Sequence, residues 1–473
     1  MKILFIYKYA NYEPLGLMTL SAILKKAGHQ CQYIDVHFER NLIAKVKELS
    51  PDIIAYSIIT GSHKYFWDLN RKLKKHHNYL ALFGGPHCTF FPEFINEEGV
   101  DIICRGEGEN AIVALANNIH QGKDFTAIPN LWIKKEGFIY KNDIENLCLN
   151  LDEIPFPDRS LVNVYQHYGN MKRRDVITAR GCPYNCTYCF NHANKELLRH
   201  KGRYVRQRSV ENVIEELILL RDKYHSKKFH FQDDVFTVNR KWTLDFCESY
   251  RQKINLPFEV QLRVNLIDEE IIRELKNAGC TVAMYGIESG NFPLRKNLLN
   301  RNISDEQILN AAELFKKYKI KTMTVNILGL PDETLAMAFE TVKLNIRCKP
   351  SYAWNSIFQP YPMTKLAEYS KQKNYFDGDV NVFEDSFLYG RSTMKTKDIK
   401  MIERLHFLFS VAVSFPFILP FIHLLTKIPL LGFYRLLFFL HRVYAAFFSL
   451  KRISFSEIFV FEKSRYFTIK RKW

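Results

Sequence analysis

The sequence lacks the features of secreted and membrane-spanning proteins. Its first apolar run is short, and Lys8 follows it without the longer apolar core and cleavage site of a signal peptide. The ten cysteines are scattered over 473 residues, unlike a secreted disulfide framework. Near the C-terminus, prolines and basic residues interrupt every apolar run before the roughly 20 residues that a membrane span requires. The sequence therefore predicts a cytoplasmic protein in a reducing compartment.

Nucleic-acid motifs are also missing. Lysine and arginine outnumber aspartate and glutamate by 67 to 50, and the net charge of +17 favours anionic partners. However, no stretch alternates basic and aromatic residues, and no helix-turn-helix, zinc-finger or RNP-like pattern occurs. We therefore expect no nucleic-acid partner. A hydrophobic content of 47% is enough to build the cores of two or three domains.

The first part of the chain alternates apolar strands with helical spacers. A helix is predicted over residues 15–27, and strands over residues 2–7, 32–35, 53–59, 80–83 and 101–104. This alternation predicts an α/β, doubly wound, Rossmann-like parallel sheet, whose ligands bind beyond the carboxyl ends of the strands. The loops expected there are residues 11–16, 60–62 and 84–87. Residues 129–168 predict an edge hairpin followed by a proline-containing connector.

A second alternation begins at Asp175. Six strand-helix units follow, with strands near Val176, Phe229, Val260, Val282, Val325 and Ser356. They predict a partial (β/α) barrel of the TIM type, in which chemistry occurs at the carboxyl ends of the strands. The domain boundaries that follow are 1–150 for the first sheet, 151–170 for a linker, 171–365 for the barrel and 366–473 for a helical C-terminal region.

The C-terminal region is apolar and ends in basic residues. Phe, Leu and Ile dominate residues 407–450, which predict helices lying at a membrane interface. The basic end, suited to anionic lipid headgroups, comprises Lys463, Arg465, Lys470, Arg471 and Lys472. The region therefore favours peripheral association with the inner face of the membrane and a lipid-like small-molecule substrate. A helical cap on the barrel or a dimer contact explains the same composition.

Cys182, Cys186 and Cys189 form a CxxxCxxC motif in the loop after the first barrel strand. Three thiolates on one tight loop can bind three irons of a 4Fe-4S cluster and leave the fourth iron open for a substrate. A structural zinc site normally needs four protein ligands, and His192 is the only close candidate for the fourth. Zinc and three unrelated cysteines stay as the alternatives.

With this motif, the chain resembles radical S-adenosylmethionine (SAM) enzymes that carry a cobalamin-binding-type domain in front of the barrel. The resemblance covers residues 1–365. It implies that the open iron binds the amino and carboxylate groups of SAM, and that an electron from the cluster cleaves SAM to a 5′-deoxyadenosyl radical. It also implies an electron donor such as flavodoxin or ferredoxin, and cobalamin as a further cofactor.

The resemblance assigns other residues at strand ends to SAM. Asp233 and Asp234 would meet the methionine ammonium, Glu288 would meet the ribose hydroxyls, and Gly290 would allow the ligand to approach closely. The remaining residues assigned to SAM are Tyr188, Phe190, Arg263, Ser289, Gly329 and Gln359. Structural explanations stay open: a helix N-cap for one aspartate, core or turn positions, and local partners for Arg263 and Gln359.

The same resemblance assigns loops of the first domain to cobalamin, although turn signals of this kind are common in any doubly wound sheet. These residues are Leu15, Gly16, Thr60, Gly61, Ser62, Gly84, Gly85, Pro86, Arg105, Gly106 and Glu107. The cobalt-binding DxHxxG pattern of many cobalamin proteins is missing after the first strand. Asp35 and His37 look similar, but they follow the second strand and have Arg40 in place of glycine, so we interpret His37 as a loop residue.

Three functions stay open at this point. The first is cobalamin-dependent radical methylation of an unactivated carbon. The second is radical carbon-carbon coupling, cyclisation or rearrangement without methyl transfer. The third is a non-catalytic, membrane-associated protein in which the cluster is structural. Product analysis and the loss of SAM cleavage on Cys186→Ala would separate them.

Overall fold

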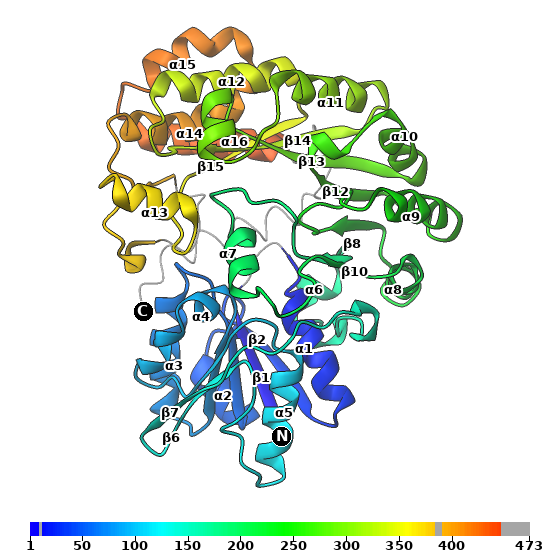
Figure 1. Cartoon of the computed structure of the whole chain (residues 1–473), viewed down its shortest axis with the longest axis vertical. Helices are drawn as coiled ribbons and strands as arrows, with labels where there is room; N and C mark the ends of the chain where they lie inside the picture. Colours follow the sequence, from blue (N-terminus) through cyan, green and yellow to red (C-terminus); the bar gives the residue numbers. More distant parts are fainter. Residues whose placement is uncertain (9–11, 384–389, 446–473) are drawn as a thin grey trace. The chain divides into compact units, whose positions relative to one another are not determined.

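The computed structural model describes residues 1–8, 12–383 and 390–445 (Figure 1). Its contacts divide the chain into two compact units. The first unit comprises Met1–Asp175 and Leu198–Arg206, and the second comprises Val176–Leu197 and the chain from Gln207 onward. The four-part division predicted from the sequence stays a prediction.

The first unit is built on a sheet with strand order β2-β1-β3-β4-β5-β6-β7. The first five of these strands are parallel, and β6 and β7 add an antiparallel edge hairpin. The strands are β1 (Lys2–Tyr7), β2 (Gln30–Asp35), β3 (Ile53–Ser57), β4 (Leu80–Gly84), β5 (Ile102–Cys104), β6 (Leu131–Lys135) and β7 (Phe138–Lys141). The predicted doubly wound sheet is confirmed.

Burial on both faces explains why the central strands are continuously apolar. In β1, Ile3 and Phe5 pack on one face of the sheet, while Leu4 and Ile6 pack on the other. The helices of this unit are α1 (Leu15–Lys26), α2 (Leu42–Leu49), α3 (His63–Lys74), α4 (Pro86–Phe90), α5 (Glu109–His120) and α6 (Gln166–Gly169), with 3₁₀ turns η1 (Pro92–Asn96), η2 (Leu151–Glu153) and η3 (Arg159–Leu161).

The second unit contains the partial barrel, with strand order β15-β14-β13-β12-β11-β8. Its strands are β8 (Arg173–Val176), β11 (Lys228–Phe231), β12 (Phe258–Leu262), β13 (Cys280–Glu288), β14 (Lys321–Leu328) and β15 (Tyr352–Ile357). Neighbouring strands from β11 to β15 are parallel. A short ladder joins β9 (Ala179–Arg180) to β10 (Arg206–Gln207). All six predicted strand positions lie in these barrel strands.

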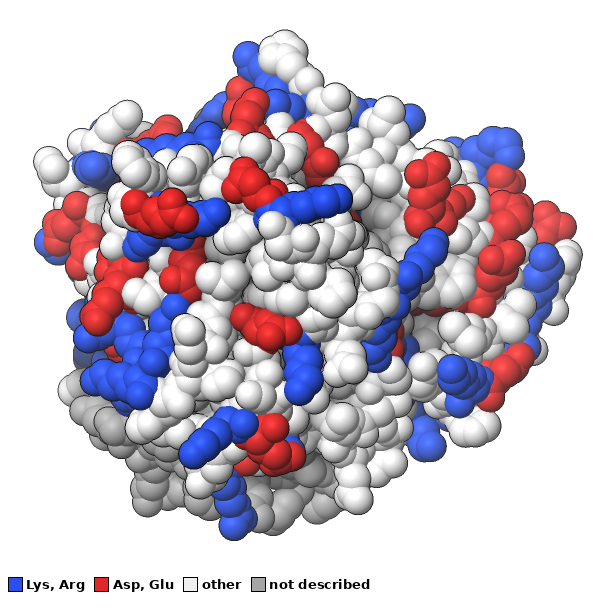
Figure 2. Space-filling model, turned by 90° about the horizontal axis from the view of Figure 1, so that it is seen from below, with Lys and Arg blue, Asp and Glu red and all other residues white. Residues whose placement is uncertain are grey.

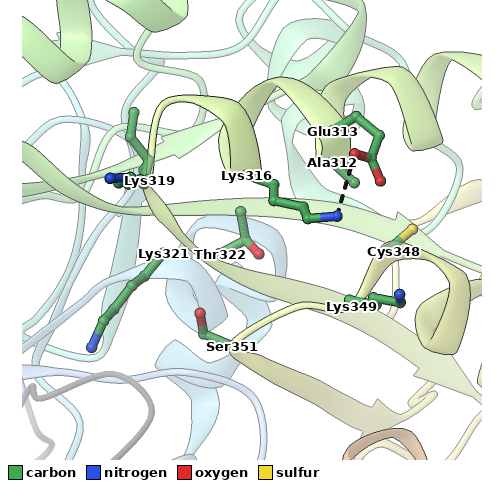
Figure 3. Close-up of a pocket in the computed structure, with 10 residues that line it drawn as sticks. Ala312, Glu313, Lys316, Lys319, Lys321, Thr322, Cys348, Lys349 and Ser351 are labelled. Carbon is green, nitrogen blue, oxygen red and sulfur yellow. Dashed lines mark ion pairs between the residues drawn. The ribbon is translucent and has the colours of Figure 1, made fainter.

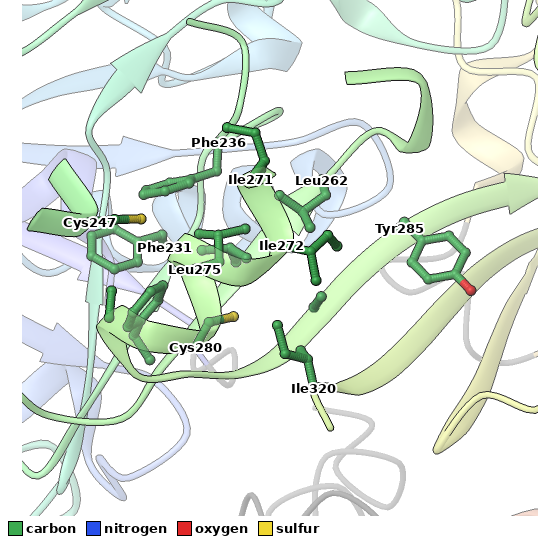
Figure 4. Close-up of a cluster of buried hydrophobic side chains, with 14 of the residues drawn as sticks. Phe231, Phe236, Cys247, Leu262, Ile271, Ile272, Leu275, Cys280, Tyr285 and Ile320 are labelled. Atoms are coloured by element: carbon green, nitrogen blue, oxygen red, sulfur yellow. The ribbon is translucent and has the colours of Figure 1, made fainter. Parts of the chain in front are cut away.

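Amphipathic helices follow the barrel strands and bury their apolar faces. Figure 4 shows part of the resulting core. Phe231 of β11, Phe236 in the loop after β11 and Leu262 of β12 lie in one apolar cluster with Ile271 and Ile272 of the helix that follows β12. The helices are α7 (Phe190–Leu197), α8 (Val210–Asp222), α9 (Arg240–Lys253), α10 (Glu269–Ala278), α11 (Asp305–Lys317) and α12 (Leu335–Cys348), with short turns η4 (Val264–Leu266) and η5 (Leu294–Leu298).

The first part of the apolar C-terminal region packs on the barrel. The elements here are α13 (Lys365–Gln372), η6 (Val380–Val382), α14 (Ile399–Ser414), η8 (Pro416–Ile418), α15 (Leu419–Leu425) and α16 (Leu431–Tyr444). Helix α14 packs on β15 and α12, and Phe407, Leu408 and Phe409 are buried in that core. The apolar composition at the start of residues 407–450 therefore reflects a cap on the barrel. The predicted basic end lies outside the described residues.

None of the helices that the structure describes is long and apolar enough to cross a membrane. The surface charge is mixed on the face shown in Figure 2, where acidic side chains are interspersed among basic ones. An alternating pattern of this kind does not concentrate the net charge of +17 into one basic groove on that face.

Candidate functional site

The three-cysteine loop joins β9 to α7 in the second unit. Cys182 and Cys186 are buried, and Cys189 is half-buried. The backbone holds the loop in place, because the Cys189 amide donates to the Cys186 carbonyl at 3.1 Å and the Thr187 amide donates to the Leu299 carbonyl at 3.2 Å. Burial raises the pKa of Cys182 to about 11 and also raises the pKa of Cys189. Three soft sulfur donors on one fixed loop fit an iron-sulfur cluster.

The zinc alternative fits this loop poorly. Within residues 1–8, 12–383 and 390–445, no three or more His, Cys, Asp or Glu side chains come close enough to hold one metal ion. Zinc ligands must converge on one ion, whereas cluster cysteines bind different irons. His192 already uses both ring nitrogens: Nδ1 pairs with the Cys186 carbonyl at 3.1 Å, and Nε2 accepts from the Lys365 amide at 3.2 Å.

Two buried arginines face Cys186. The Arg263 guanidinium, after β12, donates to Cys186 Sγ at 3.5 Å and lies 3.7 Å from the centre of the Tyr184 ring. Arg301, after η5, donates to the Gly286 carbonyl at 2.7 Å, and its charge acts on Cys186. Burial opposes the charge on Arg301, but Tyr188, Glu288 and Cys186 together raise its pKa. Positive charge is therefore concentrated at one of the three sulfurs.

Glu288 ends β13 in a backbone conformation that is rare for a side-chain-bearing residue, with φ of 66°. Its carboxyl group lies 3.9 Å from the Arg301 guanidinium. Burial raises the pKa of Glu288, and Arg301 and Tyr188 act against that rise. Gly286 makes this arrangement possible, because a Cβ there would lie 1.9 Å from Glu288 Oε1. Sequence reasoning missed Gly286, although a glycine inside a strand was the available signal.

Asp233, after β11, presents a buried oxygen that has no partner. Its Oδ1 accepts from the Thr178 amide at 2.9 Å and from the Thr178 hydroxyl at 2.8 Å, while Oδ2 is unpartnered. Burial raises the pKa of Asp233 to about 6. A buried, unpartnered carboxylate oxygen of this kind can accept hydrogen bonds from a cationic ligand such as an ammonium group. The N-cap alternative is wrong, because Asn239 caps α9 and Asp234 accepts from Asn191 at 3.1 Å.

The turn after β14 is held by a residue that sequence reasoning missed. Glu333 Oε2 accepts from the amides of Gly329 and Leu330, and burial raises the pKa of Glu333 to about 8. Its Oε1 is buried without a partner. Gly329 has φ of 76°, which favours glycine. The only sequence signal was an acidic residue a few positions after a turn, which is common on protein surfaces.

Other residues predicted to bind SAM have structural partners. A Cβ at Gly290 would lie 2.4 Å from the Glu340 carbonyl, so packing against α12 explains this glycine. Gln359 donates to the Arg391 carbonyl at 2.7 Å and accepts from Thr393 at 3.1 Å, which supports the local-partner alternative. The Phe190 ring lies 5.8 Å from that of Tyr361, and the Ser289 carbonyl accepts from Arg295 at 2.6 Å.

In the first unit, the loops predicted to face cobalamin lie at the carboxyl ends of parallel strands. Thr60 Oγ1 pairs with His87 Nδ1 at 3.0 Å, and the rings of His87 and His63 stack 4.2 Å apart. Burial and His63 lower the pKa of His87 to about 3. Gly61 donates to His63 Nδ1 at 3.2 Å, and Ser62 donates to the Ile59 carbonyl at 3.1 Å. These polar groups therefore already have hydrogen-bond partners within the first unit.

Packing inside the sheet explains other predicted cobalamin residues. Gly85 has φ of 92°, and a Cβ there would lie 2.8 Å from the Ile58 carbonyl. Gly84 has only ordinary contacts, and Pro86 starts α4. In the first turn of α1, Leu15 is buried and Gly16 is exposed. The prediction explained Gly85 by the close approach of a corrinoid. In the structure, close packing against the Ile58 backbone already requires a glycine at this position.

The loop after β5 is also fixed by its own contacts. Arg105 Nε donates to the Thr89 carbonyl at 3.4 Å, and the Gly106 amide donates to Thr89 Oγ1 at 3.1 Å. Glu107 accepts two hydrogen bonds from Arg206, at 2.8 and 3.0 Å. The structure therefore assigns the Glu107 carboxylate to a partly buried ion pair with Arg206.

Apolar exposure at the same end of the sheet fits a large ring system. Ile59, after β3, is 50% exposed, and Tyr12, after β1, is 49% exposed. A neighbouring anchor fixes the β1 loop, because buried Glu13 accepts from Arg159 at 2.5 Å and from Arg174 at 2.8 Å. The sequence places Tyr12, Glu13 and Ile59 in or directly before the loops expected to face the ligand, but it gives none of the three a role of its own, since isolated apolar or acidic loop residues carry little signal.

One hollow of about 340 Å³ lies elsewhere, at the amino ends of β14 and β15 (Figure 3). Lys321 and Thr322 begin β14, and Ser351 precedes β15. Lys316 pairs with Glu313 at 3.7 Å on its rim. Chemistry in barrels of this kind occurs at the carboxyl ends of the strands. The hollow is therefore at the wrong end of the strands to belong to the cysteine site.

Family models match both units. A model of the radical SAM superfamily matches residues 176–344, and a model of the B12 binding domain matches residues 1–116. An uncharacterized methyltransferase of Pyrococcus horikoshii is 31% identical over 370 residues, covering 76% of this chain and 79% of that protein. An anaerobic magnesium-protoporphyrin IX monomethyl ester cyclase of Cereibacter sphaeroides is 28% identical, covering 78% and 62% respectively. A hopanoid C-3 methylase of Methylococcus capsulatus is 23% identical, covering 76% and 68%.

A solved structure has the same fold. The radical SAM methyltransferase TsrM of Kitasatospora setae, with cobalamin and a 4Fe-4S cluster bound, has a TM-score of 0.66 and 16% identity, covering 79% of this chain and 75% of that one. The radical SAM domain implies a 4Fe-4S cluster and SAM, and the B12-binding domain implies cobalamin. These matches identify an enzyme and set aside the non-catalytic alternative. The chain belongs to the radical SAM superfamily, among the methyltransferase-like members that carry a B12-binding domain in front of the radical SAM domain.

Proposed function

We propose that this enzyme transfers a methyl group to an unactivated carbon in a cobalamin-dependent radical reaction. The observation that carries the proposal is the unpartnered Asp233 Oδ2 in the unit that holds the cysteine loop. A buried acceptor of this kind costs stability in the free protein unless a ligand satisfies it. The names of two relatives, a methyltransferase and a hopanoid methylase, support methylation as the outcome.

The residues present have distinct tasks. Cys182, Cys186 and Cys189 would hold the cluster, Asp233 would accept hydrogen bonds from the ammonium of SAM, and Glu288 would accept them from its ribose. When bound, the cluster and SAM supply a radical, and cobalamin supplies the methyl group. The chain itself binds and orients these groups and excludes water from buried positions. A low-potential donor such as flavodoxin or ferredoxin would supply electrons.

Product analysis tests this proposal. The full chain is reconstituted anaerobically with iron, sulfide and hydroxocobalamin, and is then incubated with reductant, a bacterial lipid extract and SAM that carries a deuterated methyl group. We expect 5′-deoxyadenosine and S-adenosylhomocysteine together, and a lipid whose mass increases by one labelled methyl group. A chain that binds cluster and corrinoid but forms neither nucleoside product would contradict the proposal.

A second candidate is radical cyclisation or rearrangement without methyl transfer. The relative from Cereibacter sphaeroides, named as a cyclase, favours it. The same experiment separates the two, because this candidate yields 5′-deoxyadenosine without S-adenosylhomocysteine and leaves the label out of the product.

A lipid-like substrate and peripheral membrane association belong to the proposal as well. In η8 and α15, Phe417 is 77% exposed and Phe421 is 67% exposed, and several apolar side chains of α16 are also exposed. Between Glu403 and Glu457 the sequence has no acidic residue, while Lys427, Arg435 and Arg442 are basic. An exposed apolar face with basic neighbours is suited to an anionic lipid surface.

Flotation with vesicles tests this part of the proposal. We expect the full chain to float with phosphatidylglycerol vesicles more than with phosphatidylcholine vesicles. The double substitution Phe417→Ser and Phe421→Ser should reduce flotation, since both rings are exposed. Phe138→Ser on β7, where the ring is 68% exposed, is the matched control. Equal flotation of the double variant and the control would remove the argument for a lipid surface.

A further inference from the structure

The three cysteines experience different charges. The Arg263 guanidinium donates to Cys186 Sγ at 3.5 Å, and the charge of Arg301 also acts on Cys186. The carboxylate of Asp234 instead accepts from the side chain of Asn191 at 3.1 Å. Asn191, a neutral donor, lies 3.6 Å from Cys189 Sγ. The loop therefore presents Cys186 to a positively charged donor and Cys189 to a neutral one.

The two arginines differ in how far their charge is compensated. Arg301 lies 3.9 Å from the carboxyl group of Glu288. Arg263 has neutral partners: its Nε donates to Asn265 Oδ1 at 2.8 Å, and its guanidinium lies over the Tyr184 ring. A buried charge is poorly screened by solvent, and a guanidinium cannot lose its proton in a protein. Arg263 is therefore a fixed charge whose direct contacts are neutral; the Glu288 carboxylate also acts on it, but more weakly than on Arg301.

Reduction adds one electron to an iron-sulfur cluster. Hydrogen bonds to the cluster sulfurs and nearby positive charge stabilise the reduced form, and they are among the factors that set the reduction potential. Stacking on Tyr184 and the hydrogen bond to Asn265 hold the Arg263 guanidinium in place before any cluster binds, so its effect does not require rearrangement.

We propose that Arg263 is a positioning residue that raises the reduction potential of the cluster through Cys186, with a smaller contribution from Arg301. The inference rests on the proposed ligation of the cluster by Cys186. In the reaction concerned, one electron passes from a low-potential donor to the cluster, whose charge becomes more negative by one. Arg263 makes that transfer easier and is not itself changed.

A redox titration tests the proposal. The full chain and its variants are reconstituted anaerobically, and iron and sulfide are counted first. Dithionite with mediator dyes then sets the solution potential, without SAM, and electron paramagnetic resonance measures the reduced fraction. At the midpoint of the parent, Arg263→Gln should lower the ratio of reduced to oxidised cluster about tenfold, which is a shift of about 59 mV for one electron. Arg263→Lys, which keeps the charge, should stay within about threefold of the parent.

Further variants keep the test decisive. Arg301→Gln should shift the ratio less than Arg263→Gln, because Glu288 compensates Arg301. Tyr184→Leu removes the ring on which Arg263 stacks and should shift the ratio of reduced to oxidised cluster in the same direction as Arg263→Gln. It replaces Arg263→Gln in the test if Arg263→Gln does not bind iron. Arg240→Gln, at an exposed pair with Asp268, is the control and should match the parent.

The outcomes distinguish this inference from the proposed function. A parent that binds no cluster overturns both. A parent that binds a cluster whose potential is unchanged by both Arg263→Gln and Tyr184→Leu overturns the inference alone. A potential that changes equally in Arg263→Lys and Arg263→Gln also overturns it, because loss of charge would then not be the cause.

Discussion

The strand ends of the two sheets use their polar residues differently. In the barrel, buried polar atoms stay without a partner at Asp233 Oδ2, Glu333 Oε1 and Arg301 Nε. In the first unit, buried unpartnered atoms such as Gln32 Oε1 and Arg206 Nε also occur, but the polar residues predicted to bind the cofactor have partners, as Thr60 has in His87 and Glu107 has in Arg206. The difference suits ligands of different chemistry. A small zwitterion needs complementary polar atoms, while a large ring system is bound mainly by shape and apolar contact.

The largest effect is expected at the cysteine loop. Cys186→Ala removes one of three ligands and leaves two arginines facing an empty position, so we expect loss of the cluster and SAM cleavage at background level. Iron content and 5′-deoxyadenosine formation measure this. Cys31→Ala, at a half-buried cysteine of the first unit, is the control and should retain both. Equal iron content in the two variants would contradict the ligand assignment.

A smaller effect, on the affinity for SAM, is expected at Asp233, whose Oδ2 is unpartnered. Asp233→Asn removes the charge of the acceptor, and a hydrogen bond to a charged group is worth about 1.5–3 kcal/mol, so affinity for SAM should fall roughly 10- to 100-fold. Equilibrium binding of SAM to the reconstituted enzyme measures it. The neighbour Asp234→Asn is the matched comparison, and a smaller loss is expected because Asn191 already occupies that carboxylate. If Asp234→Asn weakens binding more, the assignment of Asp233 is wrong.

The pH dependence of stability extends the comparison to Glu333. The folded pKa is raised to about 8, above the ordinary value of 4.5, so the folded state holds its proton more tightly than the unfolded state. The contribution of Glu333 to the free energy of unfolding is fully present below about pH 4.5. It is lost as the pH rises through about 8, and the loss is on the order of a few kcal/mol.

Urea unfolding between pH 5 and pH 9 measures this dependence. Glu333→Gln keeps an acceptor for the Gly329 and Leu330 amides but does not titrate, so its stability should vary less across that range. Glu313→Gln, at an exposed carboxyl group on α11, is the control and should follow the parent. A parallel pH dependence in Glu333→Gln and the parent would show that another group is responsible.

Periodicity predicted most of the fold, because the central strands of both sheets are largely buried and therefore read as apolar runs. The predicted strand over residues 2–7 coincides with β1, and the barrel strands lie where the apolar runs predicted them. The end of the barrel was less predictable. Residues 407–413 have the same apolar composition as α16, yet α14 is buried while α16 is partly exposed. The amino-acid composition alone does not show that α14, and not α16, is the helix buried on β15.

The candidate site was predicted to the extent that its residues belong to a motif. The cysteine loop, Asp233 and Glu288 follow strands in the expected order. Gly286 and Glu333 were missed, because their roles depend on contacts across the barrel that no local spacing shows. The residues predicted for cobalamin were chosen from turn signals, and several of these turns are explained by packing inside the first unit alone.

The smallest effect is expected at the end of the first sheet. If the corrinoid is bound by apolar contact, Ile59→Ser should reduce the corrinoid retained after reconstitution, because burying an exposed aliphatic side chain against a ligand is worth about 1.5 kcal/mol or more. Stability of the free protein should stay within about 0.5 kcal/mol, since Ile59 is half exposed. Phe138→Ser, also exposed but on the edge hairpin, is the control. Absorption spectra of the gel-filtered proteins measure corrinoid content. Equal corrinoid in both variants would show that cobalamin is not bound by apolar contact at Ile59.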